Sequence, residues 1–452
     1  MTGVVWLRRD LRVRDHPALC AAAAEGPIVP LVVLDPLLTQ DSPRFQSYLH
    51  AVRALREDLD GLVVRVGDPR YVVPAVCAEA RARAVHVSAE VTPYGRHRDA
   101  AVRLALARAG VEWIATGSPY AVTPGRVRTR AGMPFHVFTP FARAWRDSPV
   151  PSPPDPPARV RYTRVVSADL PETGTATHPV PVTEAQARAR WQEFLTDEIA
   201  GYGRDRDRPD HEATSRLSTA LKLGSIHPRT LLSDLRSRAA TRSDGVERFI
   251  TELAWREFYA DVLWHHPRSA WHDLKDSLHG MQYDHPETNP LAAQHLSAWQ
   301  AGRTGYPFVD AGMRQLRAEG WMHNRVRMVT ASFLTKDLHI WWPHGARHFL
   351  DLLRDGDLAS NSHGWQWVAG TGTDAAPYFR IFNPVTQGLR FDPDGEYVRR
   401  YVPELAHLPG AAAHEPWKHP GPHVAGYPPR IVDHAAERQE ALDRYAARGA
   451  NP

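Results

Sequence analysis

The sequence predicts two parts of different fold class: an N-terminal α/β part with a Rossmann-like, doubly wound parallel sheet, and a C-terminal part that is all-α. Three observations lead to this prediction. Strand and helix patterns alternate over the first third of the 452 residues, a proline-rich stretch follows, and strand patterns are missing beyond residue 184. Alternation of this kind is typical of parallel strands joined by helices.

Five short apolar runs, rich in β-branched residues, predict the strands of the sheet. They lie at 4–7, 28–34, 62–66, 85–87 and 111–115, and stretches with helical spacing lie at 16–24, 47–60, 74–83 and 98–109. Ligands of such sheets bind beyond the carboxyl ends of the strands. The first strand is followed by RRDLR at 8–12 and not by G-x-G-x-x-G, which excludes NAD binding in the usual mode.

The segment 149–181 predicts a long connector because it is rich in proline. Proline lacks a backbone donor and fixes φ, so this stretch is neither a helix nor a central strand. Helical patterns follow one another from there to residue 410. We therefore expect an α/β domain at 1–130, a connector at 131–190, a helical domain at 191–440 and a tail at 441–452.

Composition narrows the class of protein further. The two cysteines, Cys20 and Cys77, exclude a disulfide framework and a four-cysteine metal site. HEAT at 211–214 and HEPW at 414–417 lack the second histidine of a zinc-protease helix, so no metal is expected. Without an 18-residue apolar run or a signal peptide, the chain is expected to be cytoplasmic. A net charge of +4 permits nucleic-acid binding but does not argue for it.

Two polar clusters in the helical part are candidates for chemistry. The segment 214–218, TSRLS, places hydroxyls and an arginine before a helical stretch, which fits either a plain N-cap or a phosphate site. Asp355-Gly356-Asp357 is followed by Asn361, and from these residues alone an exposed turn is the favoured interpretation. Glu252 and Trp255 lie three residues apart and so share one helix face.

Four segments of the helical part, at 214–226, 252–259, 304–328 and 355–388, resemble the photolyase/cryptochrome family, and WLRRDLRVRDHPAL at 6–19 resembles its antenna domain. The resemblance runs from residue 4 to about residue 434 and is to the class I cyclobutane pyrimidine dimer photolyases. It implies a carbon–carbon lyase in which light-excited, reduced FAD repairs a flipped-out pyrimidine dimer in DNA by electron transfer. The helical domain would then be the FAD-binding catalytic domain.

The resemblance also implies which residues bind FAD. Asp355 is expected to pair with Arg327, and Asn361 would lie opposite flavin N5, where an amide both donates and accepts without adding charge. The full set is Tyr202, Thr214, Ser215, Arg216, Leu217, Ser218, Phe249, Arg256, Asn324, Arg327, Asp355, Gly356, Asp357 and Asn361.

A flipped dimer needs stacking walls and polar contacts to its base edges. By resemblance, Trp255 and Trp367 supply the walls, Glu252 and Asn324 the polar contacts, and Met328 fills the remaining gap. The catalytic set is thus Glu252, Asn361, Trp255 and Trp367. DNA phosphates would be bound by Arg206, Arg325, Arg327 and Arg380, although each of these is as well explained as a surface ion-pair partner.

Asn324 also separates branches of the family, because the (6-4) photolyases and the animal cryptochromes similar to them have histidine at this position. The sequence here is Trp321-Met322-His323-Asn324, which favours the dimer branch.

Trp365 and Trp342 match the two inner members of the family's electron relay, but the third tryptophan is missing. It would fall at 283–286, where Tyr283 is the nearest aromatic residue. Tyr283 could replace it, or the relay could end elsewhere, for example at Trp299 or Trp271.

The N-terminal domain of the family carries a second, antenna chromophore. Residues 91–96, VTPYGR, with Tyr94, Gly95 and Arg96, resemble the 8-hydroxy-5-deazaflavin type more than the methenyltetrahydrofolate type; an empty site is the third alternative.

Two other functions compete with repair. A cryptochrome-type blue-light photoreceptor has the same fold and FAD, but the intact dimer pocket and the short segment after residue 428 argue against it. A flavin oxidoreductase using NAD(P)H lacks a dinucleotide fingerprint. The expected partner is UV-damaged DNA, with no membrane, no obligate protein partner and a monomeric state.

Overall fold

A computed structural model describes residues 1–172, 180–237, 243–419 and 426–448. The chain forms two compact units. Unit 1 comprises Met1–Gly203 and Ser215–Pro267, and unit 2 comprises Arg204–Thr214 and Arg268–Pro452. In the described part of the chain, no helix combines the length and the apolar character needed to cross a membrane.

Unit 1 contains the predicted parallel sheet, which has the strand order β3-β2-β1-β4-β5. The strands are β1 Gly3–Leu7, β2 Ile28–Leu34, β3 Val63–Val66, β4 Ala84–Val87 and β5 Glu112–Ala115. All four pairings are parallel. The α/β fold class is therefore confirmed, and the strand bounds lie within a residue of those expected.

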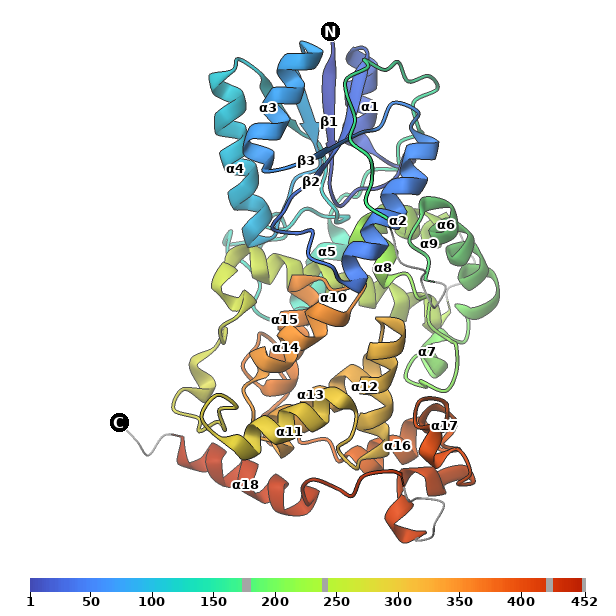
Figure 1. Cartoon of the computed structure of the whole chain (residues 1–452), viewed down its shortest axis with the longest axis vertical. Helices are drawn as coiled ribbons and strands as arrows, with labels where there is room; N and C mark the ends of the chain where they lie inside the picture. The colour runs from blue at the N-terminus through green and yellow to red at the C-terminus, as the bar shows by residue number, and fades with distance from the viewer. Residues whose placement is uncertain (173–179, 238–242, 420–425, 449–452) are drawn as a thin grey trace. The chain divides into compact units, whose positions relative to one another are not determined.

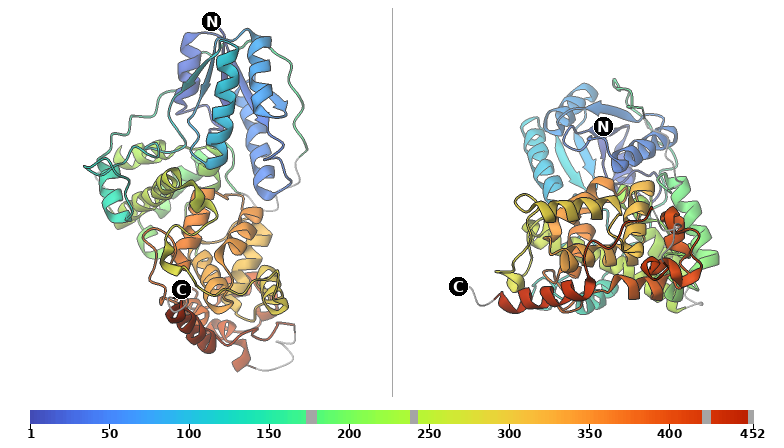
Figure 2. Two further views of the ribbon diagram at one scale, coloured as in Figure 1. Left: turned by 90° about the vertical axis from the view of Figure 1, so that its left-hand side faces the viewer. Right: turned by 60° about the horizontal axis from the view of Figure 1, so that its bottom comes forward.

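Helices cover both faces of this sheet (Figures 1 and 2). Alternate residues of β1 point to opposite faces. Val5 and Leu7 pack with α1 (Pro17–Glu25) and α2 (Pro43–Asp58), whereas Val4 and Trp6 pack with α3 (Pro69–Ala80) and α4 (Pro93–Arg108). Burial of both faces explains why the strands read as continuous apolar runs.

Three of these helices begin earlier than their apolar spacing suggested. They start at Pro43, Pro69 and Pro93, each directly after a capping side chain from Ser42, Asp68 or Thr92. Proline suits the first helical position because its missing N–H would have no partner there. The start signals were therefore the proline and the cap, not the first periodic apolar residue.

Residues 162–168 of the proline-rich connector lie against the sheet. Tyr162 forms an isolated parallel bridge with Ile28, and the Ala168 N–H donates to the Val64 carbonyl at 2.8 Å. A short helix, α5 (Phe138–Asp147), precedes the proline-rich part.

Unit 1 also contains helices from later in the chain: α6 (Glu184–Glu193), α8 (Ser218–Leu223), α9 (Pro228–Ser237) and α10 (Asp244–His265). Two buried carboxylates of α10 bind the loop that follows β5. Glu257 accepts from the Ala121 and Val122 N–H groups at 2.6 and 3.0 Å and from the Trp145 indole at 2.6 Å. Asp261 accepts from the Gly125 N–H at 2.6 Å, and burial raises its pKa to about 6.

Unit 2 is helical, as expected for the C-terminal part. Its longer helices are α11 Pro290–Ala301, α12 Pro307–Glu319, α13 Asn324–Ser332, α14 Trp342–Leu352, α15 Leu358–Ala369, α16 Pro384–Phe391 and α18 His434–Ala447. Their apolar side chains form one large core, to which α12, α13, α14 and α15 contribute. A π-helical segment, Phe333–Asp337, continues α13.

Candidate active site

A cavity of about 130 Å³ lies among α13, α14 and α15 of unit 2. Seven of its lining residues are among those that the sequence singled out: Asn324, Arg327, Met328, Asp355, Asp357, Asn361 and Trp365. The others are Ala331, Phe349, Leu353, Ser360, Gly364 and Val368. Segments that are separate in the sequence, at 324–331 and 355–368, thus meet around one space.

The first turn of α13 is fixed by His323, which is its N-cap. The His323 Nδ1 accepts from the Arg325 N–H at 3.2 Å, so the imidazole must be unprotonated at Nδ1. Burial lowers the pKa of His323 to about 3, and the positive charge of Arg325 contributes to this shift. The neutral ring therefore holds in place the turn that carries Asn324 and Arg327.

Arg327 and Asp355 form the expected ion pair at the cavity wall. The Arg327 Nη2 donates to Asp355 Oδ2 at 2.8 Å, and its Nε donates to the Met322 carbonyl at 2.8 Å. The Asp355 side chain is 3% exposed. Its second oxygen, Oδ1, is buried with no hydrogen-bond partner among the described residues. A buried carboxylate oxygen of this kind is suited to accept from a polar group of a ligand.

Asp357 and Asn361 are placed by the start of α15. Asp357 is the N-cap and accepts from the Ser360 N–H at 3.1 Å, so the pattern that resembled an exposed turn is a buried helix start. The Asn361 amide nitrogen donates to the Ala346 carbonyl at 2.9 Å, which fixes its orientation beside the cavity.

Sequence reasoning missed Gly364, the third cavity residue of α15. A Cβ added there would meet no atom within 4 Å, although the residue lies inside a helix. Glycine in a helix interior costs about 1 kcal/mol relative to alanine. An isolated glycine within a helical pattern was therefore the signal that could have identified this position.

The two tryptophans assigned to the relay are both buried in the core of unit 2. Trp365 packs directly on α14, since a Cβ on Gly345 would lie 2.2 Å from its Cη2 atom. The Trp342 indole N–H donates to Asp273 Oδ1 at 2.6 Å. Tyr283 packs in a separate cluster with Leu278, Met281 and Tyr378.

The remaining substrate residues of unit 2 lie outside the cavity lining. Trp367 packs, partly buried, against the main core. Arg325 donates to Asp207 at 2.9 Å and lies over Phe391, and Arg206 lies 3.9 Å from Asp207. Arg380 is exposed, with its guanidinium 5.7 Å from the Phe382 ring centroid.

The other expected flavin and dimer residues belong to unit 1. The Tyr202 and Phe249 rings contact each other edge to face at 5.5 Å. Glu252 and Trp255 are half-buried on α10, and Trp255 stacks on Phe138 at 3.6 Å. Arg256 donates to the carbonyls of Pro119 and Leu221 and lies over Tyr120.

The segment 214–218 divides between the units. Thr214 ends the short segment of unit 2, and Ser215 opens the second part of unit 1. Arg216 has a left-handed φ of 51°, and Leu217 is the N-cap of α8. The Ser218 hydroxyl is buried without a hydrogen-bond partner among the described residues, which supports a ligand-binding role over a plain cap.

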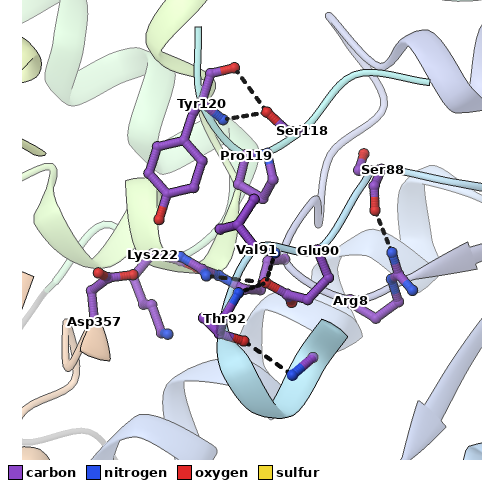
Figure 3. A network of polar contacts seen from close by, with 12 residues as sticks. Arg8, Ser88, Glu90, Val91, Thr92, Ser118, Pro119, Tyr120, Lys222 and Asp357 are labelled. Atoms are coloured by element: carbon purple, nitrogen blue, oxygen red, sulfur yellow. Dashed lines mark hydrogen bonds and ion pairs between the residues drawn. The ribbon is translucent and has the colours of Figure 1, made fainter. Parts of the chain in front are cut away.

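A charged network lies beyond the carboxyl ends of β1 and β4 in unit 1 (Figure 3). Arg8 donates to both oxygens of Asp99 at 3.1–3.2 Å and to the Ser88 carbonyl. Glu90 accepts from the Val91 and Thr92 N–H groups. Burial would raise the pKa of Glu90, but the positive charges of Arg9, Arg98 and Arg8 outweigh burial and lower it to about 2.

Of the three residues suggested for the antenna, Gly95 lies against Glu90 of this network, Tyr94 contacts Asp35, and Arg96 contacts Trp264 of α10. The Tyr94 hydroxyl donates to Asp35. Only glycine fits at position 95, because a Cβ would lie 1.8 Å from Cγ of Glu90. Arg96 donates to the Trp264 carbonyl at 3.0 Å, and its guanidinium lies 3.8 Å from the Trp264 ring centroid.

Comparison with known proteins agrees with this arrangement. Residues 3–158 match the family model described as DNA photolyase, and residues 249–447 match that described as FAD binding domain of DNA photolyase. Curated relatives named deoxyribodipyrimidine photo-lyase include those of Halobacterium salinarum (40% identical, 98% of this chain and 99% of the relative) and Escherichia coli (37%, 99% and 98%).

Solved structures are similar over the whole chain. A class III photolyase from Agrobacterium tumefaciens has a TM-score of 0.90 at 35% identity and covers 100% of this chain and 98% of its own. A cryptochrome from Synechocystis has a TM-score of 0.88 at 26% identity and covers 98% of each chain. On fold, sequence and cavity together, the chain belongs to the photolyase/cryptochrome family.

Proposed function

We propose that this protein is a deoxyribodipyrimidine photo-lyase, which uses light to split cyclobutane pyrimidine dimers in DNA. The observation that carries the proposal is the similarity to curated photo-lyases at 36–41% identity, several of which align over nearly the entire chain. The cavity among α13, α14 and α15 adds support from the residues themselves. The photoreceptor alternative is not favoured, because the curated relatives at 36–41% identity are named photo-lyases, whereas the similar cryptochrome is 26% identical.

The residues around the cavity fit FAD. When bound, FAD absorbs the light and supplies the electron that opens the cyclobutane ring. The free Oδ1 of Asp355 can accept a hydrogen bond from it, and Asn361 presents an amide that adds no charge. Arg327 neutralises Asp355, and Asp357 adds a second carboxylate to the lining. We assign the phosphates of FAD to residues 214–218, with Tyr202, Phe249 and Arg256 as further contacts.

We assign the pocket for the pyrimidine dimer from the residues that match the family motifs. Trp255 and Trp367 would stack on the flipped bases, and Glu252 and Asn324 would bind their polar edges. Met328, which lines the cavity, supplies a flexible apolar contact. Arg206, Arg325 and Arg380 would bind DNA phosphates, which makes the affinity dependent on salt but not on sequence.

Four finer assignments are also proposals. Class I is favoured by the motifs, and class III, to which the similar Agrobacterium structure belongs, is the alternative. An 8-hydroxy-5-deazaflavin antenna is preferred to methenyltetrahydrofolate because of residues 91–96. We further propose a monomer that acts in the cytoplasm.

The test is a repair assay on a thymine-dimer oligonucleotide with reduced protein, in blue light and in darkness. Glu252→Ala is expected to slow repair while FAD stays bound. Glu247→Ala is the matched control, because Glu247 lies on the same helix, is half exposed and pairs with Arg146 at 2.8 Å. Bound flavin without any dimer reversal by the parent protein would refute the proposal and favour the photoreceptor. Absorption beyond that of flavin would identify the antenna.

A further inference from the structure

Trp341 lies directly beside Trp342 at the start of α14. The two ring centroids are 6.3 Å apart, with the ring planes at 67°. Trp342 is fully buried, whereas Trp341 is partly exposed. Trp342 and Gly345, one turn apart on α14, share a helix face, and the Trp365 ring packs on Gly345. Trp365 and Trp342 therefore both lie at α14, and with Trp341 they make a row whose inner member, Trp365, lines the cavity and whose outer member, Trp341, is partly exposed.

Asp273 connects the two outer members of this row. Its Oδ1 accepts from the Trp342 indole N–H at 2.6 Å and from the Trp341 indole N–H at 3.4 Å. Loss of an electron turns an indole into a cation with an acidic N–H. A carboxylate at hydrogen-bond distance stabilises that cation by charge and can accept its proton. Asp273 is itself partly exposed, so the proton has a route to water.

We propose that Trp341 is the surface-side end of the electron relay in this protein, with Asp273 as its proton acceptor. The inference rests on the proposed FAD enzyme, because the relay needs a light-excited oxidised flavin as electron acceptor. One electron passes from Trp365 to that acceptor, Trp342 then reduces the oxidised Trp365, and Trp341 reduces the oxidised Trp342. The net change is one electron lost by Trp341 and one gained by the acceptor; the indole proton moves to Asp273, and a thiol in solution then reduces the Trp341 radical.

The other aromatic candidates are less suited to end the relay. The ring centroids of Trp299 and Trp365 are 6.0 Å apart, but Trp299 is 0% exposed and so does not reach the solvent. Its indole N–H donates to the Thr330 carbonyl, which carries no negative charge to stabilise an indole cation. The Trp271 ring lies 5.3 Å from the Arg347 guanidinium, whose positive charge opposes formation of an indole cation.

Tyr283, the residue that the sequence suggested, is also disfavoured. A phenol must lose its proton when it is oxidised. Burial, and to a lesser degree the charge of Asp273, raises the pKa of the reduced Tyr283 phenol. Its side chain packs in the cluster around Tyr378 and not in the core that holds Trp342.

The experiment compares Trp341→Phe with Tyr283→Phe and Trp299→Phe in the FAD-loaded protein. Transient absorption would follow the long-lived tryptophan radical, and steady illumination with dithiothreitol would follow flavin photoreduction. We expect Trp341→Phe to lose the long-lived radical and to photoreduce as slowly as Trp342→Phe, while the other two variants behave like the parent. Asp273→Asn, which keeps the size of the acceptor, should delay loss of the radical's proton.

Two further readouts separate this inference from the repair function. In flavin-free protein, iodide should quench the emission of the partly exposed indoles, and the quenchable fraction should be smaller in Trp341→Phe than in the parent. Repair by chemically reduced Trp341→Phe should equal that of the parent. Loss of the radical in Tyr283→Phe with normal photoreduction in Trp341→Phe would overturn the assignment, as would a parent that does not photoreduce. Failure of repair in the chemically reduced parent would instead reject the proposed function.

Discussion

Replacing Gly364 with alanine should strengthen the free protein and weaken flavin binding. The position lies in the interior of α15, and a Cβ there would meet no protein atom within 4 Å. Alanine is favoured over glycine in a helix interior by about 1 kcal/mol, so the flavin-free variant should be more stable by roughly this amount. The same methyl group would project beside the cavity that we assign to FAD.

FAD should bind less tightly to Gly364→Ala because the added methyl group overfills the space that the cofactor occupies. An extra methyl in a well-packed space costs about 1–3 kcal/mol, which corresponds to roughly a 5- to 150-fold loss of affinity. Thermal unfolding of the flavin-free protein measures the first effect, and titration with FAD, followed by quenching of flavin fluorescence, measures the second. The two effects have opposite signs, which a general loss of folding cannot produce.

Gly345→Ala serves as the matched control. A methyl there would lie 2.2 Å from the Trp365 ring and 2.6 Å from Leu334, so the flavin-free protein should gain nothing and should lose stability. If Gly364→Ala binds FAD as tightly as the parent, the space beside α15 is not the flavin site and the assignment of the cavity is wrong.

Three other predictions concern charge. Arg327→Met should destabilise unit 2 by about 3 kcal/mol in chemical denaturation, because it leaves the buried Asp355 carboxylate unpaired; Arg327→Met with Asp355→Leu should recover most of that loss. The His323 pKa of about 3 lies below the ordinary 6.5, so the unfolded state binds the extra proton. The contribution of His323 to the free energy of unfolding should be fully present above pH 6.5 and should fall by several kcal/mol toward pH 3. Asparagine at this position keeps the helix cap but does not titrate, so the Tm of His323→Asn should depend less on pH. Glu90, with a pKa of about 2 against 4.5, stabilises unit 1 above pH 4.5 and loses this contribution toward pH 2. Glu90→Gln should lower Tm at pH 7 and remove that acid dependence; an unchanged pH profile would show that the arginines do not act on Glu90.

Local pattern was enough to predict the fold class, because both faces of the sheet are buried and its strands are continuous apolar runs. Helix starts were misjudged where proline and a cap precede the first periodic residue, as at Pro69 after Asp68. The domain bounds remain a prediction, and neither compact unit ends at residue 190.

The candidate site was only partly accessible from sequence. Motif resemblance identified Asp355, Arg327 and Asn361. In the structure Arg327 and Asp355 form an ion pair, and all three residues line the cavity. The space beside Gly364 and the shared acceptor Asp273 were missed, because each depends on which helices meet and not on local spacing.

The loop after β5 is bound by carboxylates of a helix that begins more than one hundred residues later in the chain. Because Glu257 and Asp261 complete the hydrogen bonds of residues 121–125, a fragment that ends in the proline-rich stretch 149–181 would leave those N–H groups and the Trp145 indole without their acceptors. During synthesis the ribosome must therefore deliver α10 before the N-terminal sheet domain can complete its fold. Contacts so distant in sequence slow folding, and they make the N-terminal sheet domain a poor candidate for transfer to another protein as an independent module.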